Sequence, residues 1–248
     1  MTLASQPMAP AVARARPRPA ALALCARTIL FAAFQAAIAG LLWLAGSAAP
    51  WAASSAWWLM SATLTNLVCI GLLAYWMRLE GRRYWDLFTF DRAHWRGDLL
   101  VVLGLVVVTL PLVLAPNFGL ASLLFGDAQV TVTMLFKPLP AWAVWTGIGV
   151  FPVTIALAEL PVYFGYAMPR LGSGWGAALL AAYFLSLQHV ALPLVFDWRF
   201  MLWRAVMFLP FALLLAVALR LRPRLLVYLV IVHGLLDLST ALMYLSIR

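Results

Sequence analysis

The chain has 248 residues, of which 66% are hydrophobic and 10% are charged. A soluble domain of this size cannot bury so much apolar surface, so the composition excludes a soluble protein and predicts an all-α, polytopic integral membrane protein. The net charge of +9 would suggest nucleic-acid binding in a soluble protein. Here the basic residues cluster between apolar segments, as cytoplasmic loops of membrane proteins do, and we expect no nucleic-acid partner.

Residues 1–20 are rich in Pro, Ala and Arg, which is typical of a disordered cytoplasmic tail. Residues 21–248 then form a single transmembrane domain. Its two cysteines, Cys25 and Cys69, both lie in apolar runs, so no disulfide framework is predicted. Arg outnumbers Lys sixteen to one, which is typical of a GC-rich bacterial genome, and we expect the inner membrane of a bacterium.

About 20 apolar residues make one membrane crossing, so the sequence predicts about seven transmembrane helices. The basic residues between them lie mostly on one side, which predicts a cytoplasmic N-terminus and an external C-terminus. Residues 77–98 carry five Arg among aromatic residues and predict an amphipathic stretch at the membrane surface. Residues 117–138 fit either an outer loop or a re-entrant segment. The predicted spans lie near 28–46, 52–77, 99–116, 140–167, 175–194, 201–220 and 225–246.

Four ionisable side chains fall inside the later apolar segments: Glu159, His189, His233 and Asp237. Such groups are costly in hydrocarbon unless they face a protein interior or a hydrated cavity, so their presence indicates a functional site. Glu159 is placed to act as a general acid or base within the membrane. Pro161 cannot donate to the carbonyl of Leu157, which predicts a kink beside Glu159 and a free acceptor for water. A structural Glu that is hydrogen-bonded between helices is the alternative.

Gln188 and His189 are adjacent, so on one helix only one of them can face the centre fully. A histidine that only joins two helices by a hydrogen bond is the alternative there. His233 and Asp237 are four residues apart and therefore share one helical face, about 6 Å apart along the axis. The acid can fix the tautomer of the imidazole and stabilise its cation, although a self-satisfied buried pair fits the same spacing.

In order and spacing these positions resemble the CPBP intramembrane protease family, which includes type II CAAX prenyl endopeptidases and bacteriocin-processing enzymes. The resemblance covers residues 140–244, and the protease-like core is expected at about 140–246. The family motif E-E-x-x-x-R followed by G lines up with residues 159–165, F-x-x-x-H with 185–189, and H-x-x-x-N/D with 233–237. The chain departs from the motifs at Leu160, Phe164 and Leu185, which replace the second Glu, the Arg and the Phe.

The resemblance implies an intramembrane endopeptidase that hydrolyses a membrane-associated peptide or protein substrate among membrane lipids. Glu159, with His189, would deprotonate a water molecule, His233 would donate to the oxyanion, and Asp237 would orient and charge His233. A zinc alternative uses Glu159, His189 and His233 as ligands. The sequence lacks the H-E-x-x-H spacing that favours zinc, so we expect no cofactor.

Two other classes of function stay open from the sequence. The substitutions at Leu160 and Phe164 also fit a non-catalytic family member, for example a membrane interaction protein or a bacteriocin-immunity protein. Buried acids and histidines also build proton relays, which fits a proton-coupled transporter. The sequence has no internal repeat and few other polar residues in its spans, and both features weigh against the transporter.

Overall fold

The computed structural model describes residues 17–247, and the predicted all-α fold is confirmed. Within this range the chain is helical apart from short connections, and its only β-type pairing is an isolated bridge between Ala191 and Leu194. The α-helices are α1 (Pro17–Leu44), α2 (Pro50–Ser54), α3 (Trp58–Leu79), α4 (Trp95–Phe125), α5 (Val130–Leu135), α6 (Ala141–Leu160), α7 (Met168–Leu171), α8 (Trp175–Leu187), α9 (Trp198–Val206), α10 (Leu209–Leu221) and α11 (Leu226–Leu242).

Short helical pieces of other types extend or join several of these helices. They are the 3₁₀ turns η1 (Ser55–Trp57), η2 (Tyr84–Leu87), η4 (Gln188–Val190), η5 (Pro223–Leu225) and η6 (Met243–Ser246), and the π-helical segment η3 (Pro161–Ala167).

Six helical segments in the described range are long and apolar enough to cross a membrane. They are Arg18–Leu44, Pro50–Leu79, Trp95–Phe125, Ala141–Leu171, Trp198–Leu221 and Pro223–Ser246. The remaining predicted span, 175–194, is shorter: its helix covers only Trp175–Val190. The helix stops before Pro193, a residue that cannot donate a backbone hydrogen bond and that disfavours helical geometry in the residue before it. The long spans make the chain an integral membrane protein.

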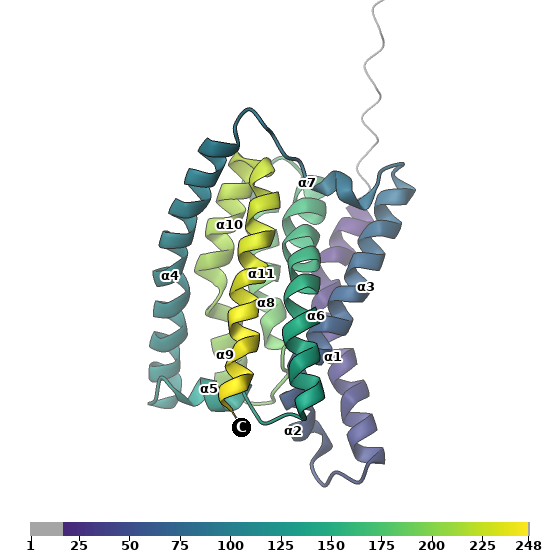
Figure 1. Ribbon diagram of the computed structural model, residues 1–248, viewed down its shortest axis with the longest axis vertical. Coiled ribbons are helices and arrows are strands. Elements are labelled where there is room, and N and C mark those ends of the chain that lie inside the picture. The colour runs from purple at the N-terminus through teal and green to yellow at the C-terminus, as the bar shows by residue number, and fades with distance from the viewer. Residues whose placement is uncertain (1–16, 248) are drawn as a thin grey trace, which may run out of the picture.

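The segments run alternately up and down through the bundle (Figure 1). Helix α4 lies at one edge, α1 and α3 lie at the other, and α6 and α11 pack against each other in the middle (Figure 1). The short helix α5 lies at the same end of the bundle as the C-terminus (Figure 1). This arrangement brings together α6, the turn η4 at the end of α8, and α11, which carry the predicted site residues.

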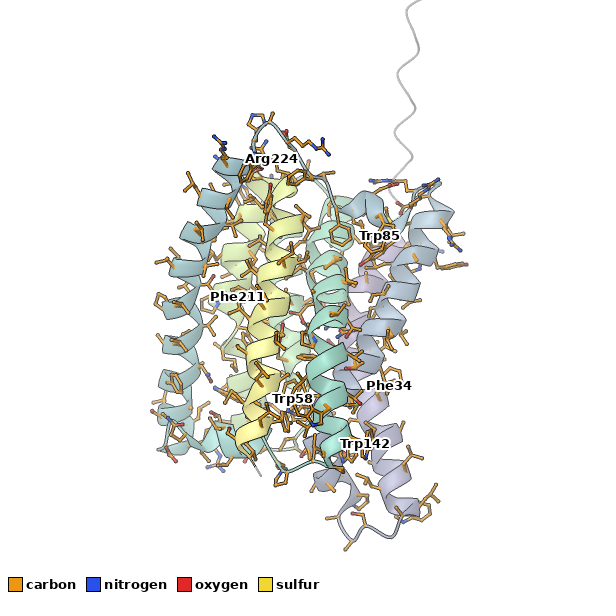
Figure 2. The ribbon with its side chains drawn as sticks, viewed as in Figure 1. Phe34, Trp58, Trp85, Trp142, Phe211 and Arg224 are labelled. Carbon is orange, nitrogen blue, oxygen red and sulfur yellow. The ribbon has the colours of Figure 1, made fainter. Side chains whose placement is uncertain are left out.

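The outside of the bundle is covered by apolar side chains along the length of the helices (Figure 2). Helix α4 is the clearest case, with Leu100 70% and Leu123 79% exposed. Trp85 lies toward one end of the bundle and Trp142 toward the other (Figure 2), and both are exposed. Exposed apolar residues between two levels of tryptophan are typical of a surface that faces lipid.

Helix α1 starts earlier than the sequence predicts. It begins at Pro17, so residues 17–20 of the predicted tail are helical and the predicted start of the first span at residue 28 is wrong. Arg27, just before the predicted start, lies within the helix and is fully buried in the bundle. The predicted tail residues 1–16 lie outside the described residues.

The two connecting stretches also differ in detail from the prediction. Helix α4 continues to Phe125 and ends at Gly126, whose φ of 76° suits the left-handed C-cap that glycine adopts at low cost. The stretch 117–138 is thus the last turns of α4, then the short helix α5 and a linker. In the stretch 77–98 only Tyr84–Leu87 forms a helical turn between α3 and α4, and Trp85 and Phe90 are exposed there.

Candidate active site within the bundle

The helix that carries Glu159 changes character immediately after it. Helix α6 ends at Leu160, and a π-helical segment, Pro161–Ala167, continues the same rod. Pro161 has no backbone N–H to donate to the Leu157 carbonyl. This carbonyl instead accepts a hydrogen bond from the Tyr84 hydroxyl at 2.5 Å. The prediction that this carbonyl is free for water is therefore wrong, because a tyrosine from the loop after α3 occupies it.

Glu159 is buried, with 2% of its surface exposed, and both carboxylate oxygens have close polar neighbours. Oε2 accepts hydrogen bonds from Nη2 of Arg27 at 3.1 Å and from Nε2 of Gln188 at 2.9 Å. Oε1 lies 3.0 Å from Nε2 of His233. Positive and polar groups from α1, η4 and α11 therefore surround one acid on α6.

Arg27 is the central residue that sequence reasoning missed. Its Nε donates to Oε1 of Gln188 at 2.6 Å and its Nη1 donates to Oδ1 of Asn66 on α3 at 2.8 Å. Asn66 in turn donates to Thr154 on α6 at 3.2 Å. The signal was available, because an arginine inside an apolar run is as costly in a membrane as a glutamate and therefore needs a partner.

The two residues that follow Glu159 in the candidate motif, Leu160 and Phe164, are both buried among apolar residues of the core. The cation beside Glu159 comes from another helix, because the guanidinium of Arg27 on α1 pairs with it.

His233 and Asp237 stack on one face of α11 as predicted, with Nε2 of the imidazole 3.4 Å from Oδ2 of the carboxylate. The same nitrogen lies 3.0 Å from Oε1 of Glu159, but it has hydrogen-bond alignment with neither acid. His233 thus lies between two carboxylates at ion-pair distance.

His189 lies where helix α8 ends and the turn η4 begins. Its Nδ1 is 2.9 Å from the Leu185 carbonyl and 3.2 Å from the Ser186 carbonyl, and its ring packs on Phe208 with centroids 4.2 Å apart. A carbonyl oxygen can only accept, so Nδ1 carries the proton and Nε2 of the neutral ring keeps a lone pair.

Gln188 and His189 both take part in the site, although the sequence predicted that only one of them could face the centre. Gln188 bonds to Glu159 and Arg27, while His189 lines the neighbouring cavity. The two side chains still leave the 3₁₀ turn in different directions. Both take part because the site extends over the polar network around Glu159 and the cavity beside it.

A cavity of about 370 Å³ adjoins these residues. Glu159, His189 and Asp237 line it, and the rest of its wall is largely apolar and comes from α4, α5, α6, α9 and α11. The predicted site residues therefore converge, since His233 contacts two of the three lining residues. The other residues that line this cavity are Trp58, Val113, Leu114, Asn117, Phe118, Thr131, Val132, Leu135, Phe136, Phe151, Ile155, Leu192, Trp203, Arg204, Met207, Phe208, Thr240 and Met243.

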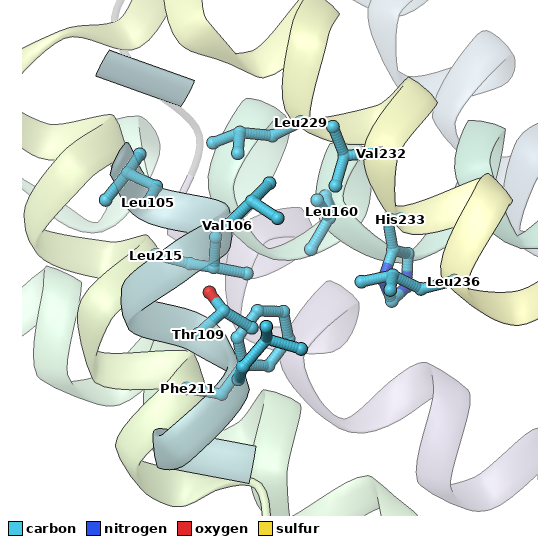
Figure 3. A pocket seen from close by; sticks show the side chains of 11 residues that line it. Leu105, Val106, Thr109, Leu160, Phe211, Leu215, Leu229, Val232, His233 and Leu236 are labelled. Atoms are coloured by element: carbon cyan, nitrogen blue, oxygen red, sulfur yellow. The ribbon is translucent and has the colours of Figure 1, made fainter. Parts of the chain in front are cut away.

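His233 itself borders a second and much smaller space, of about 30 Å³, between α4, α10 and α11 (Figure 3). Apart from Thr109, its neighbours there are apolar, among them Leu160 and Phe211 (Figure 3). A space of this size holds about one water molecule. The imidazole therefore separates an apolar gap from the two carboxylates.

The cavity exists because α8 stops halfway along the bundle. After Val190 the chain continues without regular helix as far as Trp198, and such backbone is tolerated at membrane depth only where protein or a cavity surrounds it. Arg204 donates to the carbonyls of His189 and Leu192, and the Gln35 amide pairs with the N–H and carbonyl of Leu194. Side chains of α9 and α1 thus provide hydrogen-bond partners for backbone groups in the non-helical segment after η4.

The zinc alternative named Glu159, His189 and His233 as ligands. Among residues 17–247 no group of three His, Cys, Asp or Glu side chains has the arrangement to hold a metal ion. Glu159 Oε2 faces a guanidinium and His189 Nδ1 faces two carbonyls, so these atoms already have partners.

Comparison of the chain with protein-family models, with curated proteins and with solved structures gave no match.

Proposed function

We propose that the chain is an intramembrane endopeptidase of the CPBP type, which hydrolyses a peptide bond of a membrane-associated substrate. One observation carries the proposal: groups from three segments distant in sequence, Glu159, His189, and the His233–Asp237 pair, meet around one cavity. Ionisable groups inside a membrane are energetically costly, and a shared role in binding a water molecule and a substrate would explain why they are present.

In the proposed reaction a water in the cavity attacks the carbonyl carbon of the scissile bond. Nε2 of His189 takes the proton of that water, because its lone pair is free while Nδ1 donates to the backbone. Glu159 orients the water through Oε1, since Arg27 and Gln188 hold Oε2. The proton on His189 then passes to the amide nitrogen as the C–N bond breaks, which leaves a carboxylic acid, carrying the second proton of the water, and an amine.

His233 supplies the electrostatic part of this mechanism. A protonated imidazole between Glu159 and Asp237 stabilises the negative charge that develops on the carbonyl oxygen. Asp237 keeps the proton on His233 and fixes the ring, as the spacing of the two residues predicts. In this mechanism Asp237 therefore acts through His233 and does not touch the substrate.

The test is a cleavage assay on membrane substrates with purified protein in lipid. His189→Gln is expected to lower kcat about 10²- to 10⁴-fold, the usual contribution of a general base, while the melting temperature stays close to that of wild type. His94→Gln is the matched control, because His94 is an exposed histidine outside the bundle interior. Full activity of His189→Gln would refute this assignment, and a chelator arm tests the metal alternative.

One observation favours a second candidate, a non-catalytic membrane interaction protein. Arg27, Gln188, Asn66 and Glu159 form a hydrogen-bonded network that joins α1, α3, α6 and η4, which suits a purely structural role. On this hypothesis Glu159→Gln lowers stability, and His189→Gln leaves the cellular phenotype unchanged. Loss of the phenotype in a stable, membrane-inserted His189→Gln variant would exclude it.

A further inference from the structure

Arg204 on α9 is a buried cation with no acidic partner. Its side chain is 5% exposed, and among residues 17–247 no carboxylate lies within ion-pair distance of it. Nε donates to the His189 carbonyl at 3.1 Å, Nη2 donates to the Leu192 carbonyl, and Nη1 donates to the sulfur of Met207 at 3.6 Å. The guanidinium also lies near the rings of Trp203 and Phe208, at 5.4 and 5.7 Å. A guanidinium has five N–H donors, so some of these remain unused.

The other charged groups of the site lie close to one another. Arg27 pairs with Glu159, and His233 lies within ion-pair distance of both Glu159 and Asp237. Arg204 lines the same cavity and is left over. A buried charge without a counter-ion is strongly destabilising, whereas a bound anion that accepts two parallel hydrogen bonds from a guanidinium removes much of that cost.

The remaining wall of the cavity indicates what kind of anion fits. Besides the polar residues already discussed, most lining side chains are apolar, for example Phe118, Val132 and Met207. Small polar groups are present at Asn117, Thr131 and Thr240. An apolar chain would pack against such a wall, and a single negative group at its end would reach the guanidinium.

We propose that Arg204 binds the carboxylate at the end of an apolar chain that occupies this cavity. The ligand is either a long-chain fatty acid or an apolar peptide with a free carboxyl end, since both present the same chemistry to the guanidinium. If the ligand is the substrate, this inference rests on the proposed endopeptidase function. It then names the substrate class, an apolar peptide with a free carboxyl end. Binding is measured without turnover, so the two proposals can fail separately.

The experiment compares ligands that differ only in charge, on purified protein in lipid nanodiscs. Dodecanoate is compared with dodecanol, and an N-acylated tri-leucine acid with its C-terminal amide. Wild type is expected to bind at least one carboxylate about tenfold or more tightly than its neutral counterpart, because a hydrogen bond to a charged group discriminates on that scale. The pair that shows the preference identifies the source of the carboxylate.

Variants test whether the preference for carboxylate over neutral ligands arises at this cavity. Arg204→Gln is expected to abolish it and Arg204→Lys to retain part of it. Arg199→Gln, which changes an exposed arginine on the same helix, is expected to leave it unchanged. Val132→Trp adds bulk at the α5 wall of the cavity and leaves Arg204 in the sequence. It is expected to weaken binding of every ligand, which separates cavity binding from partition into lipid.

Three results would overturn the proposal: equal binding of charged and neutral ligands by wild type, a preserved preference in Arg204→Gln, or unchanged binding in Val132→Trp. If Arg204→Gln does not fold, the wild-type comparison and Val132→Trp still decide the question. Glu159→Gln separates the two proposals, because a variant that no longer cleaves but keeps the carboxylate preference supports binding at Arg204 independently of catalysis.

Discussion

Arg27 on α1 and Glu159 on α6 are 132 positions apart in the sequence, and their side chains form a buried ion pair with Nη2 and Oε2 3.1 Å apart. Neither side chain is more than 2% exposed. This pair anchors the first helix to the helix that carries the central acid of the site. It also sets the charge of the site, because it neutralises Glu159 before any substrate arrives.

Loss of one partner of this pair is expected to be severe. Arg27→Gln leaves a buried carboxylate without its cation, which costs about 3–5 kcal/mol of folding free energy. Denaturation in detergent measures the loss. Arg18→Gln at the exposed start of α1 is the control and is expected to change stability little. The double variant Arg27→Gln/Glu159→Gln is expected to be more stable than Arg27→Gln alone, and a further loss in the double variant would contradict the pairing.

The Tyr84 hydroxyl compensates for the proline in the membrane helix. Tyr84→Phe removes the donor to the Leu157 carbonyl and leaves a buried acceptor unpaired, which is expected to cost about 1–3 kcal/mol. Thermal unfolding in detergent measures this loss. Tyr75→Phe on α3 removes a hydroxyl from a side chain that is 57% exposed, so it should be nearly neutral. Equal effects of the two variants would argue against the role assigned to Tyr84.

Close packing of α11 on α6 fixes the position of His233. A Cβ added at Gly234 would meet the Pro152 carbonyl oxygen and the Ala156 Cβ, each at 3.1 Å. Gly234→Ala is therefore expected to push the helices apart and cost about 1–3 kcal/mol, as overpacking does. Gly149→Ala is the control, since a Cβ there meets nothing within 4 Å. The same variant should lower cleavage, because it moves His233 away from Glu159; unchanged stability and activity would contradict this account.

The Glu80–Arg170 pair at one end of the bundle gives the protein an acid-sensitive contact. Hydrogen bonding from Arg170 lowers the pKa of the Glu80 carboxyl below its ordinary value. A group with a lowered folded-state pKa contributes its full stability above the ordinary value of about 4.3 and loses it as the pH falls through the folded pKa.

Melting temperatures between pH 7 and pH 3 test this contact. Wild type is expected to exceed Glu80→Gln at neutral pH, and the difference should shrink below about pH 4 as Glu80 is protonated. Asp127→Asn, in the turn after α4, is the control, because Asp127 contacts only the backbone of its own turn. A difference that stays constant over the whole range would show that the carboxylate charge does not contribute.

The sequence by itself determined the features that depend on local pattern. Long apolar runs set the all-α membrane fold, and spacing of four residues put His233 and Asp237 on one face of a helix. Glu159 also stood out, because an acid in an apolar run has a cost that can be read from composition.

Only the tertiary structure decided which groups meet. Nothing local links Arg27 to Gln188, 161 positions away, or Tyr84 to the carbonyl beside Pro161. The sequence did not identify Arg27 or Arg204 as site residues, because an arginine in an apolar run does not show which group is its partner. The partner lies on another helix, and periodicity carries no information about which helices pack together.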